Sequence, residues 1–221
     1  MSHRPRTGWF GGTFDPIHLG HLDVARAARQ ALWLDRVVLV PARTPPHRPR
    51  PAASATHRLA MVQLAGAETG FDVSSMELDS DGPSFTAVTL DRLAAAGTDL
   101  ADLALIMGAD AFAGIMAWHR AADVLARVVC AVVSRPGHPA GSLPDRLPAL
   151  AGDMVSAGTL RPDVPCVAPR IVLIEAPTAP VSSTAVRAAA AAGHPLGGLV
   201  PPPVEAYIRT HQVYGPPQGV A

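Results

Sequence analysis

Five short apolar runs, most of them separated by segments of helical composition, constrain the fold of this chain more than any other feature. The runs cover residues 7–11, 36–41, 102–108, 128–134 and 170–175, and a weaker extended stretch at 71–73 would add an edge strand. Continuous apolar runs of strand length are typical of parallel sheets whose two faces are both covered by helices. The pattern therefore predicts an α/β fold with a doubly wound, mostly parallel sheet.

Segments rich in Ala, Leu and Arg separate these runs and predict helices, beginning with a crossover helix over Leu19–Leu32. Four later segments have a similar character: 86–96, 121–126, 183–192 and 204–210. Residues 42–51 contain four prolines and are expected to form a loop. Residues 136–169 are rich in Pro and Gly, with a short helix expected near 147–157. No internal repeat or domain boundary is visible, so we expect residues 1–221 to form one domain.

The composition excludes several classes of protein. The chain has 221 residues, of which 48 % are hydrophobic and 16 % charged, so it can bury a core and is not of the disordered type. Its 18 basic and 18 acidic residues cancel, which argues against a general nucleic-acid or membrane-surface binder. All the basic residues are arginines. A phosphate-binding P-loop lysine and a Schiff-base lysine are therefore excluded.

The two cysteines and the hydropathy pattern bear on location. Cys130 and Cys166 are too few to form a metal cage alone, and their number fits a reducing compartment. The basic segment 1–7 is not followed by an apolar stretch of signal-peptide length. No run of about 18 apolar residues indicates a membrane span. We therefore expect a soluble, cytoplasmic protein.

The segment Gly11–Leu22, GGTFDPIHLGHL, carries the strongest chemical signal. A strand is expected to end at Gly11 and Gly12, whose missing side chains leave room for a ligand phosphate against the backbone. The following helix start offers unpaired N–H groups and the positive end of its dipole to an anion. His18 and His21 lie three residues apart across this start, so their rings fall on one side and could donate to phosphate oxygens.

Other interpretations of this segment stay open at the level of the residues alone. Two glycines after a strand can form nothing more than a tight turn, and they fit neither the dinucleotide-binding nor the Walker pattern. The H-x-x-H pair could be half of a zinc site, although no Cys, His or Glu with suitable spacing accompanies it. Asp15 could be a metal ligand or a residue that shapes the loop beside Pro16.

Two motifs carry a resemblance to a known family. The string GGTFDPIHLGH resembles the signature of the HxGH nucleotidyltransferase superfamily, and Val181–Arg187, VSSTAVR, resembles its late ISSTxxR element. The resemblance implies a Rossmann-like nucleotidyltransferase fold and transfer of a nucleotidyl group from ATP or CTP with release of pyrophosphate. It assigns catalytic roles to His18, His21 and Arg187. Considered alone, Arg187 could instead be a solvated surface residue.

Three further strings narrow the implied substrate. Residues 45–48 (PPHR), 83–90 (PSFTAVTL) and the run formed by 108–112, 117–118 and 134–137 resemble PPHK, PSYTxxTL and GxD…W…RPG elements. These elements belong to the bacterial nicotinate-mononucleotide adenylyltransferases. The resemblance covers residues 8–214 and implies the reaction of nicotinate mononucleotide with ATP in NAD biosynthesis. Arg48 stands where the family often has lysine, and Phe85 stands where it usually has tyrosine.

The resemblance also implies the binding residues. For ATP they are Gly11, Gly12, Thr13, His18, His21, Gly108, Asp110, Ser182, Ser183, Thr184 and Arg187. For nicotinate mononucleotide they are Phe14, His47, Arg48, Phe85, Thr86 and Trp118. Trp118 would stack on the pyridine ring, although considered alone it could equally be an ordinary core residue. Thr86 would cap a helix starting near Ala87 whose N–H groups receive the nicotinate carboxylate. Asp110 would accept hydrogen bonds from the adenosine ribose, and His47 and Arg48 would lie near the mononucleotide phosphate.

The expected mechanism is direct in-line attack by the mononucleotide phosphate on the α-phosphorus of ATP, without a protein nucleophile. Mg²⁺ is expected to be carried by ATP and pyrophosphate, with no metal site of the protein's own. The alternatives are a phosphopantetheine adenylyltransferase, a cytidylyltransferase, or a non-catalytic nucleotide-binding regulatory module. The sequence does not indicate the preference for acid over amide, loop closure on substrate binding, or whether the chain forms a homo-oligomer.

Overall fold

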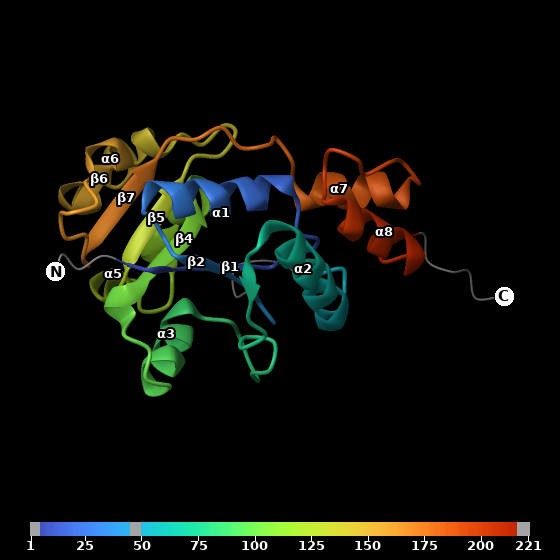
Figure 1. Ribbon diagram of the computed structural model, residues 1–221, viewed down its shortest axis with the longest axis horizontal. Coiled ribbons are helices and arrows are strands. Elements are labelled where there is room, and N and C mark those ends of the chain that lie inside the picture. Colours follow the sequence, from blue (N-terminus) through green and yellow to red (C-terminus); the bar gives the residue numbers. More distant parts are fainter. Residues whose placement is uncertain (1–4, 45–49, 216–221) are drawn as a thin grey trace.

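The computed structural model describes residues 5–44 and 50–215 (Figure 1). Seven parallel strands form one sheet in the order β3-β2-β1-β4-β5-β7-β6. The strands are β1 Thr7–Gly12, β2 Arg36–Pro41, β3 Asp72–Val73, β4 Leu103–Gly108, β5 Val129–Val133, β6 Met154–Ser156 and β7 Arg170–Ile174. The predicted doubly wound parallel fold is confirmed.

The strand order reverses between β1 and β4, which are neighbours in the sheet. Their register begins at Thr7 opposite Leu103 and ends at Trp9 opposite Leu105, three residues before the end of each strand. In open parallel sheets, ligands bind at such a reversal, beyond the carboxyl ends of the strands. The topology therefore places the binding crevice where the loops after β1 and β4 diverge.

Eight helices surround the sheet in the described residues. They are α1 Leu19–Ala31, α2 Ala55–Thr69, α3 Thr86–Ala95, α4 Ala109–Phe112, α5 Ala121–Arg127, α6 Leu143–Arg146, α7 Ser183–Ala191 and α8 Pro202–Thr210. Helices α1 and α2 cover one face and share a core with α7 and α8, which lie beyond the end of the sheet, whereas α3 to α6 share the core of the other face; α1 and α3 therefore lie on opposite sides (Figure 1). None of the described helices is long and apolar enough to cross a membrane.

Alternate residues of each inner strand pack into two separate cores, one on each face of the sheet. Phe10 and Leu39 face the layer with α1, whereas Trp9, Val38 and Val40 face the layer with α3. Because neighbouring side chains of a strand point to opposite faces, a strand covered on both sides must be apolar throughout. This accounts for the continuous apolar runs of the sequence.

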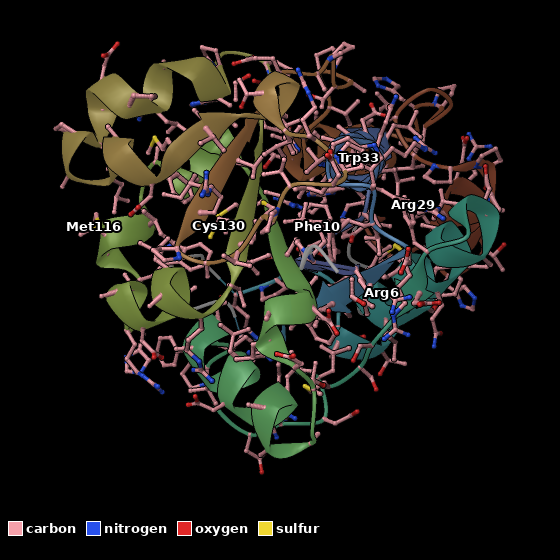
Figure 2. All side chains as sticks on the ribbon, turned by 60° about the vertical axis from the view of Figure 1, so that its left-hand side comes forward. Arg6, Phe10, Arg29, Trp33, Met116 and Cys130 are labelled. Carbon is pink, nitrogen blue, oxygen red and sulfur yellow. The ribbon has the colours of Figure 1, made fainter. Side chains whose placement is uncertain are left out.

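Figure 2 shows the contrast between the sheet and the surface of the α3 layer. Cys130 lies on the sheet and is fully buried, as the sequence predicts, whereas Met116 stands at the margin of the molecule and is largely exposed. Both Cys130 and Cys166 are free and buried.

Helix α2 was not predicted from the sequence. Ser54 caps it by accepting a hydrogen bond from the His57 amide, and Gly70 ends it with a φ of 70°. Its buried side is made of Arg58, Met61, Val62, Ala65 and Gly66. An arginine and a glycine on this face hide the apolar period by which a helix is recognised.

The helix expected near 147–157 was wrong. Pro148–Asp153 forms a 3₁₀ segment, and Met154–Ser156 forms β6, which pairs with β7. Pro148 cannot donate a backbone hydrogen bond, and Gly152 disfavours a helix interior, so pairing with the sheet edge prevails.

Candidate active site

The first turn of α1 brings the two histidines into contact. His18 is the extended N-cap residue of α1, with φ −145° and ψ 170°. The rings of His18 and His21 are stacked with centroids 3.7 Å apart. The His18 amide donates a 3.3 Å hydrogen bond to Nδ1 of His21. Because Nδ1 of His21 accepts, the ring proton resides on Nε2, which is the atom suited to donate to a phosphate oxygen.

His18 is an electrically neutral member of this pair. Its side chain is 1 % exposed. Burial, together with the positive charge of Arg135, lowers the pKa of His18 to about 3. Its Nδ1 is buried and has no hydrogen-bond partner among the described residues. At neutral pH this imidazole can therefore stabilise an anion only as a hydrogen-bond donor, not as a cation.

The loop between β1 and α1 is closely packed. A Cβ at position 12 would lie 2.8 Å from the Phe14 ring, and one at position 20 would lie 2.9 Å from the Ala179 carbonyl oxygen. Phe14 is 1 % exposed, and its ring packs edge-on against Phe10 and His21. A contact between Phe14 and the mononucleotide would therefore involve its backbone rather than its ring. Thr13 contributes its carbonyl oxygen to a hydrogen bond from Arg58.

The start of α7 is bonded directly to this loop. Ser182 caps α7 by accepting from the Ala185 amide, and the Ser183 hydroxyl donates to the Pro16 carbonyl oxygen at 2.9 Å. Arg187 Nη1 donates to the Asp15 carbonyl oxygen at 2.8 Å, and its Nη2 donates to the Thr184 hydroxyl at 3.2 Å. The two motifs, which are far apart in the sequence, thus form one surface.

Asp15 shapes the loop. Its Oδ2 accepts from the Ala52 amide at 2.7 Å, while its Oδ1 accepts from the Ala53 amide at 3.0 Å and the Tyr214 hydroxyl at 2.8 Å. The residue is 5 % exposed. Within 5–44 and 50–215, no group of three or more His, Cys, Asp or Glu residues could hold a metal ion. Of the two roles considered for Asp15, the geometry favours loop shaping.

A second face of the crevice comes from the ends of β4 and β5. A Cβ at Gly108 would collide with Oδ1 of Asp110 and lie 3.0 Å from Cγ of Arg135. Arg135 continues past Gly108 and donates to the Val181 carbonyl oxygen at 3.3 Å. The predicted ATP residues Gly108 and Asp110 therefore lie beside Arg135, which joins this face to the segment before α7.

The start of α3 forms the third part. Thr86 is the first helical residue and Phe85 the N-cap, so the expectation that Thr86 is the cap was wrong by one position. Extended backbone at Phe85, with φ −87° and ψ 125°, lets the helix begin at Thr86 without a side-chain cap. The N–H groups of this first turn are left without partners from the helix itself and can receive an anion.

A buried carboxyl group supports this helix start. Glu77 accepts a 2.7 Å hydrogen bond from the Thr89 hydroxyl. Burial raises the pKa of Glu77, and the hydrogen bonds from Thr89 and Ser84 lower it by less than burial raises it. The Ser84 hydroxyl oxygen also accepts from the Arg43 amide at 2.9 Å, which joins the loop before α3 to the end of β2.

Trp118 is partly buried and packs against the core that includes α3. The ring of its neighbour His119 lies 4.6 Å from that of Phe85. The structure therefore brings the segment at 118–119 to the start of α3. His47 and Arg48, also predicted for the mononucleotide, lie outside the described residues.

The sequence reasoning missed three residues. Arg58 is 1 % exposed and its guanidinium donates to the carbonyl oxygens of Thr13, Ala42 and Arg43. Arg135 lies in the segment 134–137 that resembles the RPG element, but the sequence predicted no role for it. It predicted none for Tyr214 either. No local pattern reveals Arg58 or Tyr214, because their partners are distant in the chain.

Comparisons with known proteins identify the family of the chain. Residues 9–189 match the cytidylyltransferase-like family, and the chain belongs to it. A relative from Roseiflexus sp. (strain RS-1), named probable nicotinate-nucleotide adenylyltransferase, is 43 % identical over 216 residues, covering 97 % of this chain and 100 % of the relative. A relative of the same name from Symbiobacterium thermophilum is 39 % identical, with 95 % of both chains covered.

The solved structures agree at the level of the fold. Nicotinic acid mononucleotide adenylyltransferase from Plasmodium falciparum, complexed with NaAD, superposes with a TM-score of 0.70 at 15 % identity, covering 95 % of this chain and 97 % of that one. The same enzyme complexed with APC gives a TM-score of 0.68.

Proposed function

We infer that the chain transfers the adenylyl group of ATP to nicotinate mononucleotide, giving nicotinate adenine dinucleotide and pyrophosphate in NAD biosynthesis. The observation that carries this conclusion is the direct bonding of Ser183 and Arg187 to the loop that presents His18 and His21. The names of relatives about 40 % identical over nearly the whole chain support the same activity.

The residues favour a mechanism based on positioning. A phosphate oxygen of the mononucleotide attacks the α-phosphorus of ATP in line; the new O–P bond forms as the bond to pyrophosphate breaks. The attacking phosphate is already nucleophilic, so no protein nucleophile is required. His21 and His18 would donate hydrogen bonds to the triphosphate, and Arg187 would balance the charge that develops on pyrophosphate.

The other substrate fits the start of α3. The first-turn N–H groups from Thr86 onward would hold the nicotinate carboxylate, and Trp118 would stack on the pyridine ring. The ribose of the adenosine would meet Gly108 and Asp110. We keep His47 and Arg48 as the groups proposed for the mononucleotide phosphate.

Mg²⁺ is proposed to arrive with ATP and leave with pyrophosphate. Supporting this, both carboxylate oxygens of Asp15 accept hydrogen bonds from the protein. The ion would neutralise triphosphate charge while held by phosphate oxygens and water.

We further propose that residues 1–221 act as one domain in the cytoplasm, with small molecules rather than nucleic acid or membranes as partners. One continuous sheet supports the first point, and two free cysteines fit a reducing compartment.

A pyrophosphate-release assay tests the proposal. The protein is supplied with MgATP and, in turn, nicotinate mononucleotide, nicotinamide mononucleotide or phosphopantetheine. We expect the highest kcat/KM with nicotinate mononucleotide. Highest turnover of phosphopantetheine, or preference for CTP as donor, would favour another member of the superfamily. ATP binding without turnover of any acceptor would favour a regulatory module.

A further inference from the structure

Tyr214 connects the segment after α8 to the nucleotide loop. Its hydroxyl donates a 2.8 Å hydrogen bond to Oδ1 of Asp15, 199 positions earlier in the chain. The side chain packs against the core formed with α1, α2, α7 and α8. Burial raises the pKa of Tyr214 well above its usual value, so the hydroxyl keeps its proton and acts as a donor. In Figure 1 the chain leaves α8 beside α7 and α2.

Asp15 also lies close to a positively charged side chain, Arg187. Arg187 Nη1 donates to the main-chain oxygen of Asp15 at 2.8 Å, whereas the same nitrogen lies 3.9 Å from carboxylate atom Oδ2. The carboxylate is thus close to Arg187 without forming a short ion pair with it. Its hydrogen bonds go instead to the Tyr214 hydroxyl and to the amides of Ala52 and Ala53.

The distance between the Asp15 carboxylate and Arg187 affects how strongly the guanidinium can attract an anionic ligand. A guanidinium in a short ion pair with a buried carboxylate attracts a triphosphate less strongly, because the carboxylate already balances its charge. Loss of the Tyr214 hydroxyl would leave Oδ1 with one donor fewer in a buried position. A buried carboxylate that loses a donor is less well stabilised, and Arg187 lies 3.9 Å from it. Arg58 also acts electrostatically on Asp15, but its guanidinium is bonded to three carbonyl oxygens.

We propose that Tyr214 is a positioning residue of the adenylyl-transfer site: by bonding Asp15, it keeps that carboxylate from pairing closely with Arg187 and leaves the guanidinium for the triphosphate. This inference rests on the proposed function only in assigning Arg187 to ATP. It does not depend on which acceptor the enzyme uses.

The test is Tyr214→Phe, which removes the hydroxyl and preserves the ring. Tyr207→Phe is the matched control, because the Tyr207 hydroxyl on α8 contacts Nδ1 of His57 instead. We expect Tyr214→Phe to weaken MgATP binding and to lower kcat, each by about tenfold, with little change in KM for nicotinate mononucleotide. Tyr207→Phe should retain wild-type values. Thermal unfolding of both variants checks that they fold.

A double-mutant cycle with Arg187→Ala separates positioning from general structural support. In the Arg187→Ala background, Tyr214→Phe should change MgATP affinity by less than about twofold, because the guanidinium through which Tyr214 affects ATP is absent. An equal loss in both backgrounds, or wild-type MgATP affinity in folded Tyr214→Phe, would overturn the inference. A wrong proposed function would give a different result. Tyr214→Phe would still weaken MgATP binding, but the wild type would not convert nicotinate mononucleotide.

Discussion

The His18 ring stacks on the His21 ring at a centroid distance of 3.7 Å, and the His18 backbone amide bonds Nδ1 of the same partner. The contact fixes one imidazole through the backbone of the other. It also places a buried, neutral ring next to a ring whose Nε2 carries the proton.

This burial predicts a pH dependence of stability. The pKa of His18 falls from 6.5 to about 3 on folding. Between these values the unfolded chain binds a proton that the folded chain does not, so this contribution to stability is full above pH 6.5 and is lost as pH falls toward 3. We expect His18→Gln to reduce the pH dependence of unfolding in this window by up to about 1.4 kcal/mol per pH unit. Denaturant unfolding at pH 4.5 to 7 measures it; exposed His194→Gln is the control, and parallel curves for His18→Gln and wild type would contradict the prediction.

Removal of either imidazole should affect the chemical step. We expect His18→Ala and His21→Ala each to lower kcat by about 10²–10³, with a smaller rise in KM for ATP, because the lost donors act on charge that grows during transfer. Steady-state kinetics measures both constants, with His194→Ala as the control. Added zinc should not restore activity. Folded variants with near-normal kcat would refute the role of the pair.

Trp118→Ala should separate the two substrates. Lost stacking on the pyridine ring should weaken binding of nicotinate mononucleotide by about 1–3 kcal/mol, by analogy with base stacking on aromatic side chains. Binding of ATP should change little. Titration of each ligand measures this, and Trp33→Ala is the control because Trp33 lies between the end of α1 and the start of β2, at the amino end of the strands. An unchanged affinity for the mononucleotide would make Trp118 a core residue only.

The start of α3 permits a test of selectivity at a single N–H group. The wild type should prefer nicotinate over nicotinamide mononucleotide by at least about tenfold in kcat/KM. Proline is tolerated at the first position of a helix, and the extended Phe85 is compatible with a following proline. Thr86→Pro deletes the N–H at this position, so it should reduce this preference, whereas Thr86→Ala retains the N–H and should retain the preference. If both variants preferred nicotinate over nicotinamide mononucleotide to the same degree, the Thr86 amide would have no role in recognising the carboxylate.

Much of the fold is predictable from the sequence, because strands buried on both faces must be continuously apolar. Helix α2 escapes this reasoning because Arg58 is buried on its core side, where a polar residue breaks the expected pattern. The cost of burying the guanidinium is offset by its bonds to three carbonyl oxygens, two of them after β2. Those partners exist only in the folded chain.

The candidate site is likewise only partly predictable from the sequence. Short motifs indicate His18, His21 and Ser183, which lie at helix starts, and Arg187, which lies one turn after Ser183 in α7. The neutral state of His18 depends on burial and on Arg135, which follows a different strand. No spacing in the sequence contains that information.

The contacts of Asp15 also set an order of events during synthesis. They join residue 15 to partners at 52–53, 187 and 214, the last of them 199 positions later. At about 5–20 residues per second, residue 214 is synthesised on the order of 10–40 s after residue 15. A nascent chain therefore contains His18 and His21 well before Arg187 and Tyr214 have been synthesised, so the nucleotide site cannot be complete until residue 214 is available.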